Sequence, residues 1–178
     1  PLIETITAIL SVGIAYHYGV SWQTLSALFF TWALISLTMI DFHKQLLPDN
    51  IVFPLLWSGI LINMFNTFVD LESSVTGAMA GYLVLWLVYH LFKALTGKEG
   101  MGYGDFKLLA ALGAWMGWKM LPLIILLSSF VGAAIGIAMI VFARHDKNIP
   151  IPFGPYLAIA GWIALLWGEA ITTIWLGL

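Results

Sequence analysis

The stretch MLPLIILLSSFVGAAIGIAMIVFA, residues 120–143, contains no Asp, Glu, Lys or Arg. Crossing the hydrocarbon core of a bilayer takes roughly 20 apolar residues of helix, so this segment alone predicts a transmembrane helix. Uncharged runs also occupy residues 5–40, 50–69, 73–92 and 148–168. The first of these is long enough for two spans and each of the others for one. Lipid is therefore the expected surroundings of most of the chain.

The overall composition agrees with this prediction. Of the 178 residues, 61% are hydrophobic and 9% are charged, whereas a soluble domain is typically about 45–50% apolar and about 25% charged. The formal net charge is −2, so no basic surface indicates nucleic acid as a partner. The chain has no cysteine, which excludes a disulfide or a thiolate metal site within it.

We predict an all-α membrane protein, a polytopic bundle of about seven transmembrane helices that forms a single domain over residues 1–178. Glycine and proline clusters separate the helices, as is usual at helix ends. The uncharged run at 108–118 is short and must extend into its flanks to cross. The predicted helices cover residues 5–19, 22–41, 50–69, 75–95, 104–118, 120–142 and 156–176.

The basic residues predict an orientation. If residue 1 faces the cytoplasm, the loops 41–50, 96–104 and 143–155 face it as well. Only Lys119 then lies on the opposite side, which satisfies the positive-inside rule. The residues on the cytoplasmic side are Lys44, Lys93, Lys98, Lys107, Arg144 and Lys147.

Pairs of glycines four residues apart lie in three of the apolar helices. Small residues at this spacing let helix backbones approach closely in a membrane. Packing within the bundle is the favoured interpretation, and a dimer interface is the alternative. The pairs are Gly77 and Gly81, Gly113 and Gly117, and Gly132 and Gly136.

Two acidic residues stand out, because ionisable groups at membrane depth are usually functional. Asp41 closes the second predicted helix and Asp105 opens the fifth, both at the cytoplasmic side. If these helices are neighbours, the two carboxylates meet and share a proton. One then accepts a proton from water while the other donates one to a carbonyl oxygen. Such a pair titrates as a unit and hydrolyses a peptide bond without a metal.

Helix dipoles suggest how the pair divides its roles. A helix N-terminus favours the charged form of a carboxyl group and a C-terminus favours the neutral form. We therefore predict Asp105 as the base and Asp41 as the acid.

Several neighbouring residues are candidates for support or substrate binding. Gly102 and Gly104 leave the backbone open for close approach and for positive φ, or simply form a flexible turn. Asp49 either supports the pair or is an acid at the start of the third helix. Lys107 either stabilises the ionised form of Asp105 or sets topology as a snorkelling lysine. His43 either tunes Asp41 or contacts substrate, or is a solvated loop residue.

These motifs resemble the bacterial type IV prepilin peptidases, which are Gly-x-Gly-Asp aspartyl intramembrane proteases. Asp-x5-Leu-Pro-Asp at 41–49 resembles their first signature, and Gly-Tyr-Gly-Asp-Phe-Lys at 102–107 resembles the second. Ile-Pro-Phe-Gly-Pro at 151–155 matches a stretch before their last span. Archaeal preflagellin peptidases and presenilin-like enzymes share Gly-x-Gly-Asp, but Leu-Pro-Asp and Pro-Phe-Gly-Pro favour the bacterial branch.

The resemblance implies a function. That family cleaves the leaders of type IV prepilins and of the pseudopilins of type II secretion. The cut follows a glycine, at the cytoplasmic face of the bacterial inner membrane. Carried over by motif, the catalytic pair is Asp41 and Asp105, and proteolysis needs no metal or other cofactor.

One departure from the family concerns a second activity. Most bacterial members carry an earlier span and a cytosolic segment with two Cys-x-x-Cys pairs. That segment holds zinc and supports S-adenosylmethionine-dependent N-methylation of the new pilin N-terminus. Pro1-Leu2-Ile3-Glu4 looks like the family sequence that follows it, so we expect the chain to be a fragment of a longer protein. A short peptidase-only relative is the alternative.

A proton- or ion-coupled transporter also places acids in membranes. It usually keeps them near the midplane and shows an internal repeat. Here the acids lie near one predicted face and no repeat is apparent, so a transporter is the second hypothesis.

Overall fold

The computed structural model describes residues 1–97, 100–142 and 152–176. Within these ranges the chain forms seven α-helices, one short 3-10 helix (η1) and no strand, which confirms the all-α membrane bundle. The elements are α1 (Leu2–Tyr18), α2 (Trp22–Lys44), α3 (Asp49–Asn63), α4 (Leu71–Thr96), α5 (Tyr103–Met116), η1 (Trp118–Met120), α6 (Leu121–Phe142) and α7 (Gly154–Leu176).

Four helical segments are long and apolar enough to cross a membrane by themselves. They are Trp22–Lys44, Leu71–Thr96, Trp118–Ala138 and Gly154–Ile174. The helices α3 and α5 have 15 and 14 residues, which at 1.5 Å per residue cover roughly 21–23 Å. That is less than the bilayer core of about 30 Å. These two helices are therefore shorter than the spans that surround them.

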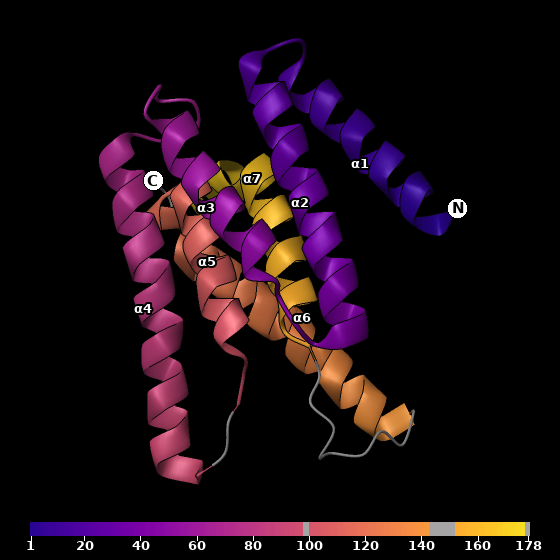
Figure 1. The fold of residues 1–178 in the computed structure, drawn as a ribbon, viewed down its shortest axis with the longest axis vertical. Helices are drawn as coiled ribbons and strands as arrows, with labels where there is room; N and C mark the ends of the chain where they lie inside the picture. Colours follow the sequence, from indigo (N-terminus) through magenta and orange to yellow (C-terminus); the bar gives the residue numbers. More distant parts are fainter. Residues whose placement is uncertain (98–99, 143–151, 177–178) are drawn as a thin grey trace.

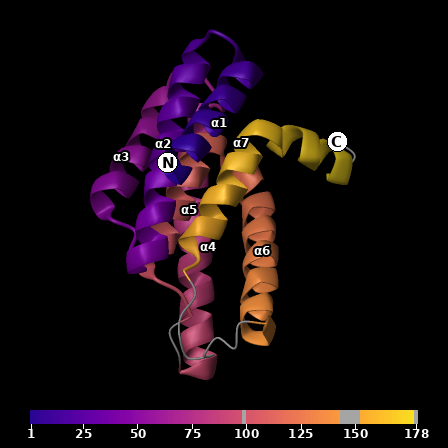
Figure 2. The same ribbon diagram turned by 90° about the vertical axis from the view of Figure 1, so that its right-hand side faces the viewer.

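The helix α5 is the centre of the bundle. Nearly all of its side chains from Phe106 to Met116 are buried, and it packs against α3, α4 and α7. Figure 2 shows α7 passing between α2 and α6 on the other side of the bundle. The buried core of the bundle is therefore built around α5.

The closest helix packing is between α4 and α5. A Cβ atom added to Gly77 would collide with the backbone of Gly113, and one added to Gly81 would lie 2.6 Å from the carbonyl oxygen of Leu109. Since backbone atoms cannot yield, both glycines are used for packing inside the bundle, as predicted. Gly117 instead ends α5 with a φ of 76°, so it serves as a helix cap.

The third helix ends earlier than predicted. It was expected to reach residue 69, but α3 ends at Asn63. The buried Asn63 side chain accepts hydrogen bonds from the backbone N–H groups of Phe68 and Val69, at 3.0 and 3.2 Å. It also donates to the carbonyl oxygens of Ala114 and Trp115. One buried amide thus ends α3 and ties the following turn to α5.

Helix ends far apart in the sequence gather at one end of the bundle. The C-terminal ends of α2 and α4 lie there together with the N-terminal ends of α5 and α7, at the lower end in Figure 1. Lys44, Lys93 and Lys107 belong to these helix ends, whereas Lys119 lies in η1, at the other end of α5. The other basic residues used to predict orientation, Lys98, Arg144 and Lys147, lie outside the described residues.

Candidate active site

The two acids singled out by the sequence share one cavity. Asp41 lies in the last turn of α2 and Asp105 in the first turn of α5, and each is only 5% exposed. Both line a cavity of about 730 Å³ at the gathered helix ends. The helices α2 and α5 thus bring the two carboxylates together, as the sequence predicted.

A glycine amide holds one oxygen of each carboxylate. The N–H of Gly102 donates to Oδ2 of Asp105 over 3.1 Å, within the first turn of α5. The N–H of Gly154 donates to Oδ2 of Asp41, also over 3.1 Å, from the first residue of α7. Each carboxylate is therefore oriented by a backbone donor at a helix N-terminus.

The hydrogen bond from Gly154 bears on which aspartate is the acid and which is the base. In the sequence, Asp41 lies only at the C-terminal end of its own predicted helix. In the fold, Asp41 also faces the N-terminus of α7, whose dipole has the opposite sign. The dipoles of α5 and α7 therefore each favour the ionised form of the carboxylate at their N-terminus. Helix dipoles thus no longer distinguish the two residues, and the assignment of Asp105 as base and Asp41 as acid stays a prediction.

Leu47 contributes an apolar side chain to the cavity that holds the two aspartates. Its side chain is 6% exposed and packs against both Gly104 and Gly154, where an added Cβ would lie 2.8 and 3.2 Å from its atoms. Leu47 belongs to the Leu-Pro-Asp element, but no role was predicted for it. No local signal distinguishes it from its neighbour Leu46, which is exposed.

Of the two predicted glycines, Gly104 serves close approach, and neither has a positive φ. Gly102 has φ −82° and ψ 154° at the start of α5, and Gly104 lies inside the first helical turn, so the expectation of left-handed backbone at these two positions was wrong. A helix start needs an extended residue followed by helical ones, which leaves no place for positive φ. The absence of a side chain at Gly104 is instead required by Leu47.

Asp49 and Lys107 form an ion pair on the rim of the cavity. The Lys107 Nζ lies 2.7 Å from Oδ1 and 2.9 Å from Oδ2 of Asp49, and 5.4 Å from the centre of the Phe53 ring. Asp49 is the first residue of α3, as one of its two interpretations predicted. The partner of Lys107 in the structure is thus Asp49, and the pair connects the start of α3 to the start of α5.

His43 lies apart from this cavity. Its side chain is exposed, its Nδ1 is 2.7 Å from the Met39 carbonyl oxygen, and it is not among the lining residues. Pro152 and Phe153, which precede α7, do line the cavity, although no role was predicted for them individually. They complete a chamber built from three separate segments of the chain.

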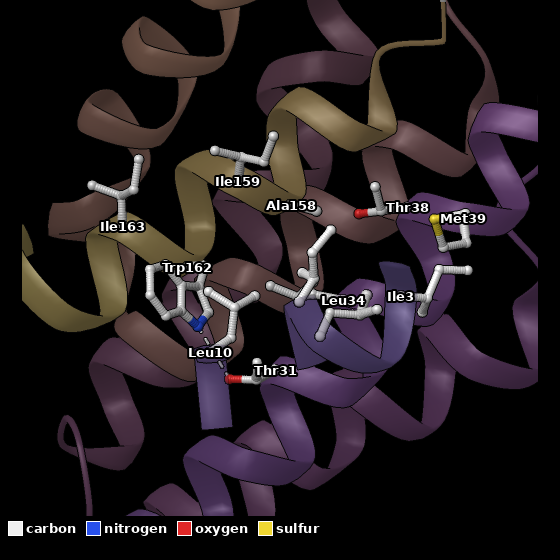
Figure 3. Close-up of a pocket in the computed structure, with 12 residues that line it drawn as sticks. Ile3, Leu10, Thr31, Leu34, Thr38, Met39, Ala158, Ile159, Trp162 and Ile163 are labelled. Carbon is white, nitrogen blue, oxygen red and sulfur yellow. Dashed lines mark hydrogen bonds between the residues drawn. The ribbon is translucent and has the colours of Figure 1, made fainter. Parts of the chain in front are cut away.

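A second hollow lies beside α2 and differs in chemistry. This groove of about 410 Å³ is lined by α1, α2 and α7, almost entirely with apolar side chains (Figure 3). Its polar contact is the hydrogen bond from Trp162 Nε1 to Thr31 Oγ1, 3.2 Å long. No titratable side chain lines it, so it suits an apolar chain and offers no acid–base chemistry.

The acidic cavity, by contrast, has the groups that hydrolysis needs. Two buried carboxylates beside each other can hold one proton between them, which supplies an acid and a base for one reacting water. In the part of the chain that the structure describes, no three His, Asp or Glu side chains gather as metal ligands. The chemistry that these residues themselves offer is proton transfer.

Comparison with known proteins relates the chain to one family. The model of the type IV leader peptidase family matches residues 28–137, which include both aspartates. Proteins named prepilin leader peptidase/N-methyltransferase are similar over nearly the whole chain. The one from Aeromonas hydrophila is 62% identical over 97% of this chain and 59% of its own length. Those from Stutzerimonas stutzeri and Pseudomonas aeruginosa are 58% and 57% identical, each over 99% of this chain and 61% of their own length.

The chain thus spans about three fifths of the length of these curated relatives. No solved structure gives a significant match.

Proposed function

This chain belongs to the type IV leader peptidase family, and on that premise we propose that it is a membrane aspartyl endopeptidase. Its proposed substrates are type IV prepilins and the related pseudopilins, whose leaders it removes by cutting after a glycine. The observation that carries this proposal is the shared cavity of Asp41 and Asp105, which brings two buried carboxylates to one place.

In the proposed reaction, a water molecule lies between the two carboxylates and the scissile carbonyl carbon. The ionised aspartate takes a proton from this water, whose oxygen then bonds to the carbonyl carbon. The protonated aspartate donates its proton to the carbonyl oxygen, which gives a neutral tetrahedral diol. Collapse of the diol breaks the C–N bond, as the amine takes a proton from one aspartate and a diol hydroxyl returns one to the other. Following the sequence argument, Asp105 starts as the base and Asp41 as the acid.

The proposed location of the cleavage is the cytoplasmic face of the bacterial inner membrane. The cavity lies at the end of the bundle to which Lys44, Lys93 and Lys107 belong, and Lys119 lies at the other end. Since lysines are enriched in cytoplasmic loops, this distribution favours an active site facing the cytoplasm.

The second activity in the relatives' names, N-methyl transfer, is proposed only for the full-length protein. It would use S-adenosylmethionine and a zinc-binding cysteine segment, and the residues present here include no cysteine. The residues of the present chain support the cleavage step, for which we expect no metal requirement. Methylation of a cleaved pilin N-terminus, followed by mass spectrometry with and without zinc, tests this second proposal.

The cleavage proposal is tested with the full-length protein in detergent and a prepilin, followed on a gel. The wild type is expected to shorten the prepilin, and Asp41→Asn and Asp105→Asn are each expected to abolish cutting while remaining folded. Glu72→Gln, at an exposed acid in the first turn of α4 away from the cavity, is the matched control and should cut normally. A chelator should leave cutting unchanged.

Two outcomes would contradict the proposal. One is a wild-type protein that leaves every prepilin intact but moves protons or ions across liposomes, as the transporter hypothesis predicts. The other is full cleavage by either Asp→Asn variant.

A further inference from the structure

The start of α7 lies directly against one of the two catalytic carboxylates. Gly154 is the first residue of α7, it is buried, and its N–H donates to Oδ2 of Asp41 over 3.1 Å. The two residues are 113 positions apart in the chain. The hydrogen bond is therefore a tertiary contact that reaches a carboxylate on another helix.

The space beside Gly154 is too small for any side chain. A Cβ atom added to it would lie 2.5 Å from Oδ2 and 3.2 Å from Cγ of Asp41, and 3.2 Å from Cδ1 of Leu47. Real Cβ atoms do not approach other atoms as closely as 2.5 Å. An alanine at position 154 would therefore push away the same oxygen atom that the glycine N–H now holds.

Neither the backbone of α2 at Asp41 nor that of α7 at Gly154 can move aside easily. Asp41 lies in the last helical turn of α2. Gly154 is followed by Pro155, whose ring restricts its own φ to a helical value. The turn before the helix is already formed, because the carbonyl oxygen of Phe153 accepts hydrogen bonds from the N–H groups of Tyr156 and Leu157. The Asp41 carboxylate is thus the part that would have to rotate.

The glycine that holds the other carboxylate is not under this constraint. Gly102 also donates its N–H to an aspartate, but a Cβ added there would lie 3.8 Å from Oδ2 of Asp105. That is ordinary contact, and its φ of −82° suits any residue. The need for glycine is therefore much stricter at 154 than at 102.

We propose that Gly154 is a positioning residue, which orients Asp41 by donating its N–H to Oδ2 and by leaving no atom where that oxygen must lie. This inference rests on the proposed function, in which Asp41 exchanges protons with water and the peptide. It gives the Pro-Phe-Gly-Pro stretch a role in catalysis through another residue, since Gly154 acts only by orienting Asp41.

The activity test compares Gly154→Ala with two matched variants in the full-length protein. Gly13→Ala is the control, because nothing lies within 4 Å of a Cβ at that position of α1. For Gly154→Ala, kcat should fall roughly 100-fold, as displacement of a catalytic group by about 1 Å commonly costs, while KM changes little. Gly102→Ala should lose far less, at most severalfold. A kcat for Gly154→Ala within threefold of that for Gly13→Ala would overturn the proposal.

A stability test needs no substrate. If the added methyl group clashes with the Asp41 carboxylate, Gly154→Ala should lower Tm in the wild-type background and lower it much less in an Asp41→Ala background. A difference of roughly 3 °C or more between the two shifts would show that the two residues are coupled. Should Gly154→Ala fail to fold, recovery of a folded protein in the Gly154→Ala/Asp41→Ala variant would support the proposal.

These measurements distinguish a failure of the proposed function from a failure of the proposed role of Gly154. If the wild type cuts no prepilin, the proposed function fails, and the Tm comparison still decides whether Gly154 positions Asp41. An equal loss of Tm or of folding in both backgrounds would mean that Gly154 serves only the packing of α7, which would overturn the positioning role.

Discussion

Lys107 and Asp49 lie 58 positions apart in the chain, yet the Lys107 Nζ is within 2.7 and 2.9 Å of the two carboxylate oxygens of Asp49. The pair joins the first residue of α3 to the first turn of α5, two residues after Asp105. The starts of α3 and α5 are thus connected by this ion pair beside the cavity of the two aspartates.

Replacing Lys107 by Met should impair cleavage more than stability. Asp49 is 54% exposed in this pair, and exposed ion pairs contribute about 0–1 kcal/mol to the free energy of unfolding. Loosening the start of α5 moves Asp105, so kcat should fall roughly tenfold or more. Measured Tm and prepilin cleavage test this, with Lys119→Met at the opposite end as the control. An Asp49→Lys/Lys107→Asp variant that regains part of the lost activity would support the pairing, and undiminished cleavage by Lys107→Met would contradict it.

The dependence of cleavage on pH should be bell-shaped. With both aspartates protonated no base is available, and with both ionised no acid is available, so activity requires the singly protonated pair. The logarithm of kcat/KM plotted against pH should therefore fall on both sides of an optimum. A rate that rises with pH to a plateau without a descending limb would argue against a shared proton.

Gly81→Ala should destabilise the bundle. The added Cβ would lie 2.6 Å from the carbonyl oxygen of Leu109, and overpacking of this kind typically costs about 1–3 kcal/mol. The thermal unfolding of the protein in detergent should shift to lower temperature, while Gly13→Ala should not lower Tm. Because the contact is within one chain, the oligomeric state should not change. A variant that dissociates a dimer without loss of Tm would instead support the alternative of a dimer interface.

Asn63→Ala should be among the most destabilising substitutions of a polar residue. The side chain is fully buried and forms four hydrogen bonds with backbone groups of the following turn and of α5. Its removal leaves buried donors and acceptors unsatisfied, at about 1–3 kcal/mol each. Asn66→Gly is the control, because Asn66 has a φ of 52° that glycine adopts readily. Equal Tm values for the two variants would show that the Asn63 hydrogen bonds contribute little.

The sequence by itself determined the membrane setting, the seven helices and the two acids. Backbone polar groups in lipid have no water to bond with, so the part of each uncharged run that lies in the bilayer must be helical. The starts of α2, α3 and α5 follow local signals, such as Ser21, whose side chain accepts from the N–H of Thr24. The alternation of helices across the bilayer also placed Asp41 and Asp105 at the same end, because the direction of each span follows from the one before it.

The tertiary structure decided which helix ends are neighbours. The helix α3 stops at Asn63 because the side chain of this residue bonds to carbonyl oxygens of α5. Lys107 pairs with Asp49 because α3 and α5 lie side by side. Most consequentially, the N-terminus of α7 lies against Asp41 through Gly154. A sequence shows the dipole of the helix that carries a residue, whereas the field and the space around a carboxylate depend on every helix packed against it, and only the fold specifies these.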